Sequence, residues 1–283
     1  MDARSDRERR LNDLSEKLAK RNLVMGILNV TPDSFSDGGR YLDRAAALDH
    51  GRRLIAEGAD LLDMGGESTR PGSEPVPPEE QIARVLPVID AIRSESDTPI
   101  SVDTQSAEVA ESALRAGADI VNDISALESS PRLGEVVATQ AAGLILMHKR
   151  GTPKTMQTDT HYSDLIGAIR AYLGDRVAAA VESGVPKQRI WVDPGIGFGK
   201  SAEGNLEILR RLTEIDAVGH PVVVGASRKS FLGKYLDRKV EDRLAGSLAV
   251  TCLVACAGGP RIHRVHDVRE TVDALRMVGA FKG

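Results

Sequence analysis

Short apolar runs in this chain repeatedly end in polar side chains that could do chemistry. These side chains carry carboxylates, amides, an amine, a guanidinium and imidazoles. Any one of them could simply begin a turn or cap a helix. Because nearly every apolar run ends in such a residue, capping alone is a poor explanation. We therefore expect these side chains to converge on one enzyme active site. They belong to Asn29, Asp103, Asn122, Asp123, His148, Asp193, Lys229, Arg264 and His266.

The chemistry of this set points to a flat ring beside an anion. Carboxylates with an amide and an amine suit a heterocycle that carries an amide and an amino group along its edges. Residues 227–230 (SRKS), preceded by Gly225, stand where a helix should begin after a strand, and free N–H groups there attract anions. Arg264 and His266 alternate along a run and therefore face the same side. Residues 69–72 (TRPG) form a second basic turn, although each of these features could instead be a solvated surface charge.

Several other kinds of site are excluded by their missing motifs. The chain has no GxSxG elbow, no HExxH, no Cys/His zinc spacing, no P-loop and no GxGxxG that opens a helix. The glycine-rich segment 195–201 lacks the spacing of a phosphate loop. Cys252 and Cys256 lie four apart in an apolar run without further ligands, so we expect small buried hydrophobes rather than a metal or redox pair.

Composition limits the partners. A formal charge of −4 and an aromatic content of 3% argue against nucleic acid as the main partner. No stretch approaches the roughly 18 to 20 apolar residues that span a membrane. The first 22 residues lack the apolar core of a signal peptide, so we expect a cytoplasmic protein.

The elements that must position the polar residues alternate between short apolar runs and longer stretches of helical period. Eight such units in 283 residues predict an α/β fold, the (β/α)8 TIM barrel, with a doubly wound open sheet as the alternative. We expect one barrel domain over 23–283 and an N-terminal extension over 1–22. Leu11, Leu14 and Leu18 share one face of a possible helix that could cover the lower end of the barrel; a frayed start is the alternative. The predicted strands are Leu23–Asn29, Leu61–Met64, Ile100–Asp103, Ile120–Asp123, Leu144–Met147, Ile190–Asp193, Val222–Gly225 and Ile262–Val265, and the predicted helices include 45–57, 79–94, 107–116, 164–183, 203–215 and 243–257.

These motifs also resemble a known family. The stretches GILNVTPDSFSDGG (26–39) and DMGGESTRPGSEPV (63–76) closely resemble the two signatures of the dihydropteroate synthases, which are pterin-binding enzymes. The likeness covers about residues 22 to 281. Later segments follow in the order and spacing of the family, namely SVDT, ADIVNDIS, LMHKRGTPKTMQ, DPGIGFGK, VGASRKSFLG and HRVHDV.

The resemblance implies a barrel, usually a homodimer, that condenses 6-hydroxymethyl-7,8-dihydropterin diphosphate with 4-aminobenzoate and releases pyrophosphate with Mg²⁺ present. It implies a metal-side role for Asn29. It implies catalytic roles for Asp33, Phe35, Asp103, Lys229, Arg264 and His266, and substrate binding by Thr69, Arg70, Pro71, Asp103, Asn122, Met147, Asp193, Phe198, Gly225, Lys229, Ser230, Arg264 and His266.

The implied reaction needs no protein nucleophile. Pyrophosphate leaves in an SN1-like step, helped by Mg²⁺ and nearby cations, and the electron-rich pterin stabilises the cationic CH₂ that the aniline nitrogen attacks. The loops at 30–40 and 66–76 are long enough to close over this cation. A corrinoid-dependent methyltransferase and a non-catalytic pterin-binding protein are the alternatives. The first would not be expected to carry TRPG or SRKSFLG, and Asn29, Arg264 and His266 weigh against the second.

Overall fold

The computed structural model describes residues 3–30, 39–68, 73–151 and 159–283. Its centre is an eight-stranded parallel sheet in the order β6-β5-β4-β3-β2-β1-β8-β7. A parallel bridge between Val192 and Val222 joins the two ends of that order, so the sheet closes on itself. The TIM-barrel prediction is therefore confirmed and the open sheet is excluded. The strands are β1 Leu23–Asn29, β2 Leu61–Gly65, β3 Ile100–Asp103, β4 Ile120–Asp123, β5 Gly143–Met147, β6 Ile190–Asp193, β7 Val223–Val224 and β8 Ile262–Val265.

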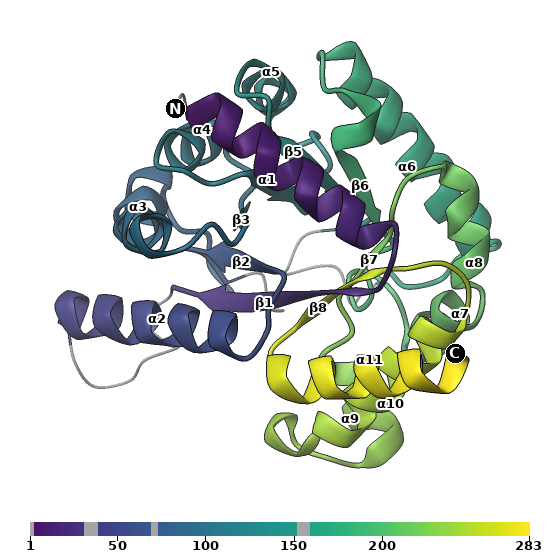
Figure 1. Ribbon diagram of the computed structural model, residues 1–283. Helices are drawn as coiled ribbons and strands as arrows, with labels where there is room; N and C mark the ends of the chain where they lie inside the picture. Colours follow the sequence, from purple (N-terminus) through teal and green to yellow (C-terminus); the bar gives the residue numbers. More distant parts are fainter. Residues whose placement is uncertain (1–2, 31–38, 69–72, 152–158) are drawn as a thin grey trace.

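Helices form a ring around the strands (Figure 1). The strand residues are almost all buried, because each strand packs on the barrel interior with one face and on the helices with the other. The α-helices are α1 Ala3–Leu18, α2 Gly39–Ala56, α3 Pro78–Glu95, α4 Ala107–Arg115, α5 Arg132–Thr139, α6 Leu165–Glu182, α7 Ala202–Arg210, α8 Leu212–Ile215, α9 Ser230–Leu236, α10 Leu244–Cys256 and α11 Val268–Lys282.

Most predicted boundaries agree with the structure to within one residue, and three elements differ in extent or continuity. The helix expected over 45–57 begins earlier, at Gly39 of α2. The helix expected over 203–215 is broken into α7 and α8 at Arg211, whose backbone leaves the helical region at φ −108° and ψ 20°. The Arg211 side chain bridges Glu207 and Glu214 across the break. The seventh strand is shorter than expected because Val222 contributes only a bridge to β6.

The N-terminal helix α1 lies across one end of the barrel (Figure 1). Leu11, Leu14 and Leu18 are buried there, at 0%, 2% and 6% exposure. Their apolar face packs against side chains from the strands, including Met25 and Trp191. This cluster fills the end of the barrel at which the strands begin, so α1 closes that end and leaves the other to carry a site.

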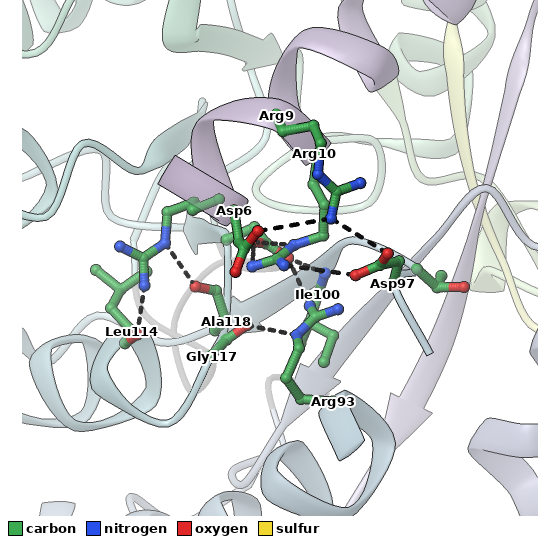
Figure 2. A network of polar contacts seen from close by, with 12 residues as sticks. Asp6, Arg9, Arg10, Arg93, Asp97, Ile100, Leu114, Gly117 and Ala118 are labelled. Carbon is green, nitrogen blue, oxygen red and sulfur yellow. Dashed lines mark hydrogen bonds and ion pairs between the residues drawn. The ribbon is translucent and has the colours of Figure 1, made fainter. Parts of the chain in front are cut away.

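Charged side chains attach α1 to the outer layer. Arg10 of α1 and Arg93 of α3 approach the same place from two sides (Figure 2). Arg10 Nη2 lies 2.8 Å from Oδ1 of Asp119, and Arg93 Nη2 lies 2.7 Å from Oδ2 of the same carboxylate. Asp119 is fully buried and also accepts a hydrogen bond from the backbone N–H of Ile100. The Nε–H of Arg7 donates to the carbonyl of Ala118, so α1 is held by directional contacts as well as by its leucines.

We predict that Arg10→Ala lowers the free energy of unfolding by about 3 kcal/mol, because it leaves a buried carboxylate short of one cation. Arg9, which is half-exposed and pairs with Asp97, is the matched control. Arg9→Ala should change stability by less than about 1 kcal/mol. Urea unfolding of both variants measures the difference, and equal losses would show that the buried pair does not anchor α1.

Within the described ranges, no helix is both long enough and apolar enough to cross a membrane.

Candidate active site

The predicted polar residues lie at the rim of the barrel where the parallel strands end. Asp103 of β3 stands beside Asn122 of β4 in the strand register, and Met147 of β5 stands beside Asp193 of β6. Asn29 of β1 ends its strand against Gly65 of β2. Because all eight strands run the same way, these ends meet at one rim, opposite the end that α1 closes.

Arg264 is the hub of a hydrogen-bonded cluster at this rim. Its Nε donates to Asp63 Oδ2 at 2.6 Å, and its Nη2 donates to Asp103 Oδ2 at 2.9 Å. Asn122 Nδ2 donates to the same oxygen of Asp63 at 3.1 Å. Side chains from β2, β3, β4 and β8 thus share one network, which includes three of the residues predicted from sequence.

Asp63 was missed by the sequence analysis. It is the third residue of β2 and not its end, and it is fully buried between apolar neighbours. A lone carboxylate inside an apolar strand is itself a signal, because ionised residues are almost never fully buried without a partner. A pattern restricted to strand ends does not include this carboxylate, because Asp63 lies inside its strand.

Opposing charges set the proton affinities in this network. Burial raises the pKa of Asp103 above its ordinary value, and the negative charge of Asp63 raises it further, while Arg264 acts in the opposite direction. For Arg264 burial opposes the charged form, yet the attraction of Asp63 and Asp103 leaves its pKa raised. The guanidinium therefore stays charged, and it is the group that keeps two neighbouring carboxylates together.

Asp193 forms a second acidic centre at the same rim. Its Oδ1 accepts a hydrogen bond from the backbone N–H of Gly195 at 2.6 Å. A Cβ at Gly225 would come within 3.9 Å of both Asp193 Oδ2 and the Arg264 side chain, so this glycine keeps the space between them open. Burial raises the pKa of Asp193, and the nearby charge of Lys229 is the strongest influence in the other direction.

Lys229 lies between Asp193 and the loop that follows β6. Its ammonium group donates to the carbonyl of Ile196 and sits 4.4 Å from the centre of the Phe198 ring. Burial lowers the pKa of Lys229 to about 8, although the carboxylate of Asp193 acts to raise it. An amine with this pKa remains mostly an ammonium at neutral pH and can donate hydrogen bonds to a ligand.

Ser227, which follows β7, orients His266, which follows β8. Ser227 Oγ and His266 Nδ1 are 3.1 Å apart, and the backbone N–H of His266 donates to the same hydroxyl. Arg228 has a left-handed backbone, with φ at 56°, and its guanidinium pairs with Asp267. Helix α9 begins at Ser230 as expected, and Ser230 is exposed.

Two other strand-end residues serve the fold rather than the cluster. The carboxylate of Asp123 accepts hydrogen bonds from the backbone N–H groups of Ser125 and Leu127, each at 2.7 Å, which is the capping role first considered for all of these residues. His148 is buried, with its Nδ1 2.8 Å from Lys200 Nζ. Burial lowers the pKa of His148 to about 3, with the charge of Lys200 acting in the same direction, so the imidazole is neutral.

Five predicted site residues lie outside the described residues. These are Asp33, Phe35, Thr69, Arg70 and Pro71.

The expectation for the cysteines is wrong in part. Cys252 is half-buried, but Cys256 is exposed on α10 rather than packed in the core. The buried face of α10 is formed instead by Ser247, Thr251 and Val254, with Ala255. Both thiols are free, and no cluster of three or more His, Cys, Asp or Glu side chains suited to a metal occurs in the described part of the chain.

The fold and the rim define a (β/α)8-barrel enzyme whose site gathers buried carboxylates and cations. The model of the family described as pterin binding enzyme matches residues 25–266. A dihydropteroate synthase of Synechocystis is 48% identical over 262 residues, which cover 93% of this chain and 91% of the relative.

Solved structures agree with this match. The dihydropteroate synthase of Xanthomonas albilineans with 4-aminobenzoic acid has a TM-score of 0.88 and 44% identity, covering 94% of each chain. That of Clostridium difficile in the presence of pteroic acid has a TM-score of 0.87 and 42% identity, covering 93% of this chain and 97% of the other. The chain therefore belongs to the dihydropteroate synthases of the pterin-binding enzyme family, and it is a transferase of folate biosynthesis. Neither alternative reading, the methyltransferase or the non-catalytic binder, finds support in these matches.

Proposed function

We propose that the rim cluster binds 6-hydroxymethyl-7,8-dihydropterin diphosphate and joins it to 4-aminobenzoate, giving 7,8-dihydropteroate and pyrophosphate. The observation that carries this proposal is the grouping of Asp103, Asn122, Asp193, Lys229 and Arg264 at one rim, with alternating charge. Buried polar groups without a hydrogen-bond partner cost about 1–3 kcal/mol each. A ligand that supplies the missing hydrogen bonds to these carboxylates removes that cost.

The pterin ring occupies the acidic side of the site in this proposal. Asp193 accepts hydrogen bonds from the 2-amino group and N3–H, and Lys229 donates to the ring carbonyl or N5. Asp103 and Asn122 pair with the remaining polar edge. Met147, 3% exposed beside Asp193, supplies an apolar wall, and Gly225 leaves room for the ring. An analogue that lacks one of these polar groups would leave its partner unpaired and bind less well.

The diphosphate lies toward Arg264 and His266 in the same scheme. Arg264 can lie over the ring and still offer N–H donors to an anion, since a guanidinium has five of them. His266 is hydrogen-bonded through Nδ1 to Ser227, a contact that orients the imidazole ring at this side of the site. Arg264 lies in β8 and His266 directly follows the end of that strand, so one segment brings the guanidinium and the imidazole to the rim.

Asn29 is the residue that would hold Mg²⁺ together with the diphosphate. Its side-chain oxygen lies at the rim beside Gly65, 3.9 Å from the position that a Cβ on that glycine would take. A single amide oxygen fits Mg²⁺, which is commonly held by one or two protein oxygens plus substrate phosphates and water. The ion would supply positive charge to the leaving pyrophosphate.

The chemical step breaks the C–O bond between the pterin CH₂ and the diphosphate, and pyrophosphate leaves with the bonding electrons. The resulting carbocation is delocalised into the pterin ring, and the aniline nitrogen of 4-aminobenzoate supplies the electron pair of the new C–N bond. The nitrogen then loses a proton to pyrophosphate or solvent. Arg264 and His266 stabilise the leaving anion, and Asp103 and Asp193 stabilise the cationic ring.

The aminobenzoate side involves Phe198, Lys229 and Ser230. Phe198 already contacts the Lys229 ammonium, so an aromatic acid placed there meets a ring face and a cation. The Xanthomonas albilineans relative was solved with 4-aminobenzoic acid, which supports this choice of second substrate. We assign Thr69, Arg70, Pro71 and Phe35 to this side as well, and a separate catalytic role to Asp33.

The proposed reaction can be tested by incubating the purified protein with both substrates and Mg²⁺ and identifying the product by mass spectrometry. We expect 7,8-dihydropteroate. An unfolding measurement first establishes that the protein is folded. If the folded protein then leaves both substrates unchanged, the proposed reaction is contradicted.

We also propose a homodimer that uses α10 and α11. These neighbouring helices carry exposed large apolar side chains, with Leu253 at 71%, Met277 at 69% and Phe281 at 89% exposure. They lie together at one side of the barrel, near the C-terminus (Figure 1). Neighbouring exposed apolar residues of this size are typical of a surface that a second subunit covers.

Leu253→Glu should convert the dimer to monomers, because it places a charge in that surface. Light scattering after size exclusion measures the mass. Ala178→Glu, which adds the same charge at an exposed position on α6, is the control and should remain dimeric. A wild-type protein that is monomeric at all concentrations would rule out this interface.

We propose that the protein works in a reducing compartment such as the cytoplasm. Both cysteines in the described residues are free thiols, as is usual where disulfides do not persist.

A further inference from the structure

Asp63 makes the contacts of an organising residue. Its Oδ2 accepts hydrogen bonds from two separate strands, from Arg264 of β8 at 2.6 Å and from Asn122 of β4 at 3.1 Å. The side chain itself is fully buried. It therefore touches both an amide and a guanidinium that the proposed pterin site depends on, from a position inside β2.

The bond to Asn122 fixes which way its amide faces. Asn122 donates one Nδ2 hydrogen to Asp63, so the nitrogen must be on the Asp63 side. The Oδ1 acceptor and the second hydrogen then form a fixed acceptor–donor pair. Without the carboxylate the amide could turn over and exchange those two positions, since its oxygen and nitrogen have nearly the same shape.

The bond to Arg264 gives the guanidinium a second anchor. Arg264 also donates to Asp103, which the proposed pterin site needs as an acceptor. When a ligand forms hydrogen bonds with Asp103 in place of Arg264, the bond from Arg264 Nε to Asp63 can remain and hold the guanidinium in position. If Asp63 could not act as an anion, Asp103 would be the sole carboxylate hydrogen-bonded to Arg264 in the described cluster, and ligand binding would compete with that pair.

Stability alone does not explain a carboxylate at this position. Asp63 Oδ1 is buried and has no hydrogen-bond partner among the described residues. Burying a charged oxygen without a protein partner costs free energy, so the carboxylate is an expensive choice for packing alone.

We propose that Asp63 is a positioning residue of the active site, which sets the orientation of the Asn122 amide and retains Arg264 when the pterin substrate engages Asp103. This inference rests on the pterin pocket proposed above. It assigns Asp63 no contact with the reacting atoms.

Asp63→Asn tests the proposal, because it keeps the shape of the side chain and removes its charge. Calorimetry with the pterin diphosphate should show an affinity about 10 to 100 times lower, the effect of losing hydrogen bonds to a charged group. The KM for 4-aminobenzoate should stay within about twofold, since Asp63 contacts only the pterin side, a split that a general loosening of the barrel would not give.

Ser101→Ala is the matched control. Ser101 is the register partner of Asp63 on β3, is fully buried and has no hydrogen-bond partner for its hydroxyl among the described residues. It should leave the pterin affinity unchanged. In an Arg264→Ala background the further loss from Asp63→Asn should shrink, because part of the effect of Asp63 acts through its contact with Arg264.

The outcomes separate this proposal from the pocket itself. If Asp193→Asn weakens pterin binding but Asp63→Asn does not, the pocket stands and the role of Asp63 is refuted. If neither variant weakens binding, the assignment of the pterin pocket is wrong. If Asp63→Asn does not fold, Asp63→Ser offers an uncharged acceptor to Asn122 and is judged by the same affinities. An equal loss of affinity for both substrates would also overturn the proposal.

Discussion

Asp193→Asn should reduce the affinity for pterin diphosphate by about 100-fold to 1,000-fold, with little change in the overall structure. The substitution is nearly isosteric, but an amide NH₂ would face ring groups that are themselves donors. It also removes the carboxylate that opposes the effect of burial on Lys229 and Lys200. Those two buried amines would then lose charge more readily, and the donors of the site would weaken with its acceptor.

Isothermal titration calorimetry measures this loss directly. Asp119→Asn is the control, because it changes another buried aspartate at the opposite end of the barrel. It should lower the stability and leave the affinity as it is. If Asp193→Asn binds pterin diphosphate as well as the wild type, Asp193 does not belong to the pterin site.

The second large effect is expected for Arg264→Ala. This variant should lower kcat/KM by about 1,000-fold, because it removes the guanidinium that stabilises the leaving pyrophosphate in the proposed reaction. It also leaves Asp63 and Asp103 without the cation that they share. Arg264 acts to lower the pKa of Asp103, so its removal should raise that pKa further. Asp103 would then take up a proton at a higher pH and lose its value as an acceptor.

Initial rates over a range of pterin diphosphate concentrations provide the measurement. Arg10→Ala removes an arginine that is equally tied to a buried aspartate but lies at the other end of the barrel. The prediction is that Arg10→Ala loses stability and keeps kcat/KM, while Arg264→Ala loses kcat/KM. An Arg264→Ala enzyme within about tenfold of the wild type would remove Arg264 from the catalytic machinery.

The sequence was sufficient to predict the fold because each strand is short, apolar and followed by a helix of clear period. Runs such as Ile100–Asp103 and Ile190–Asp193 have the same bounds in the structure as in the prediction. Parallel strands in a closed barrel must end at one rim, so the position of Asp103, Asn122 and Asp193 follows from the fold class alone. The glycines at 58, 117 and 184, each of which follows a predicted helix, adopt the positive φ that is typical of a helix C-terminal cap.

What the sequence could not supply was the pairing of side chains across strands. Asp63 and Arg264 are separated by 201 positions, and their contact depends on the register of β2, β1 and β8. Asp123 looked equivalent to Asn122 in the sequence, but adjacent strand residues point to opposite faces, and Asp123 caps its own turn. Cys256 was expected in the core because its helix is apolar throughout, which hides the face that points outward.

The most direct test of the central claim is a pyrophosphate-release assay on the wild-type protein with pterin diphosphate, run with and without 4-aminobenzoate and Mg²⁺. We expect sustained release when both are present, and a large fall when either is omitted. We also expect release by Asp193→Asn to fall to near background. Sustained release that is indifferent to 4-aminobenzoate, or an undiminished rate in Asp193→Asn, would contradict the assignment of the strand-end cluster as the site where pterin diphosphate is joined to 4-aminobenzoate.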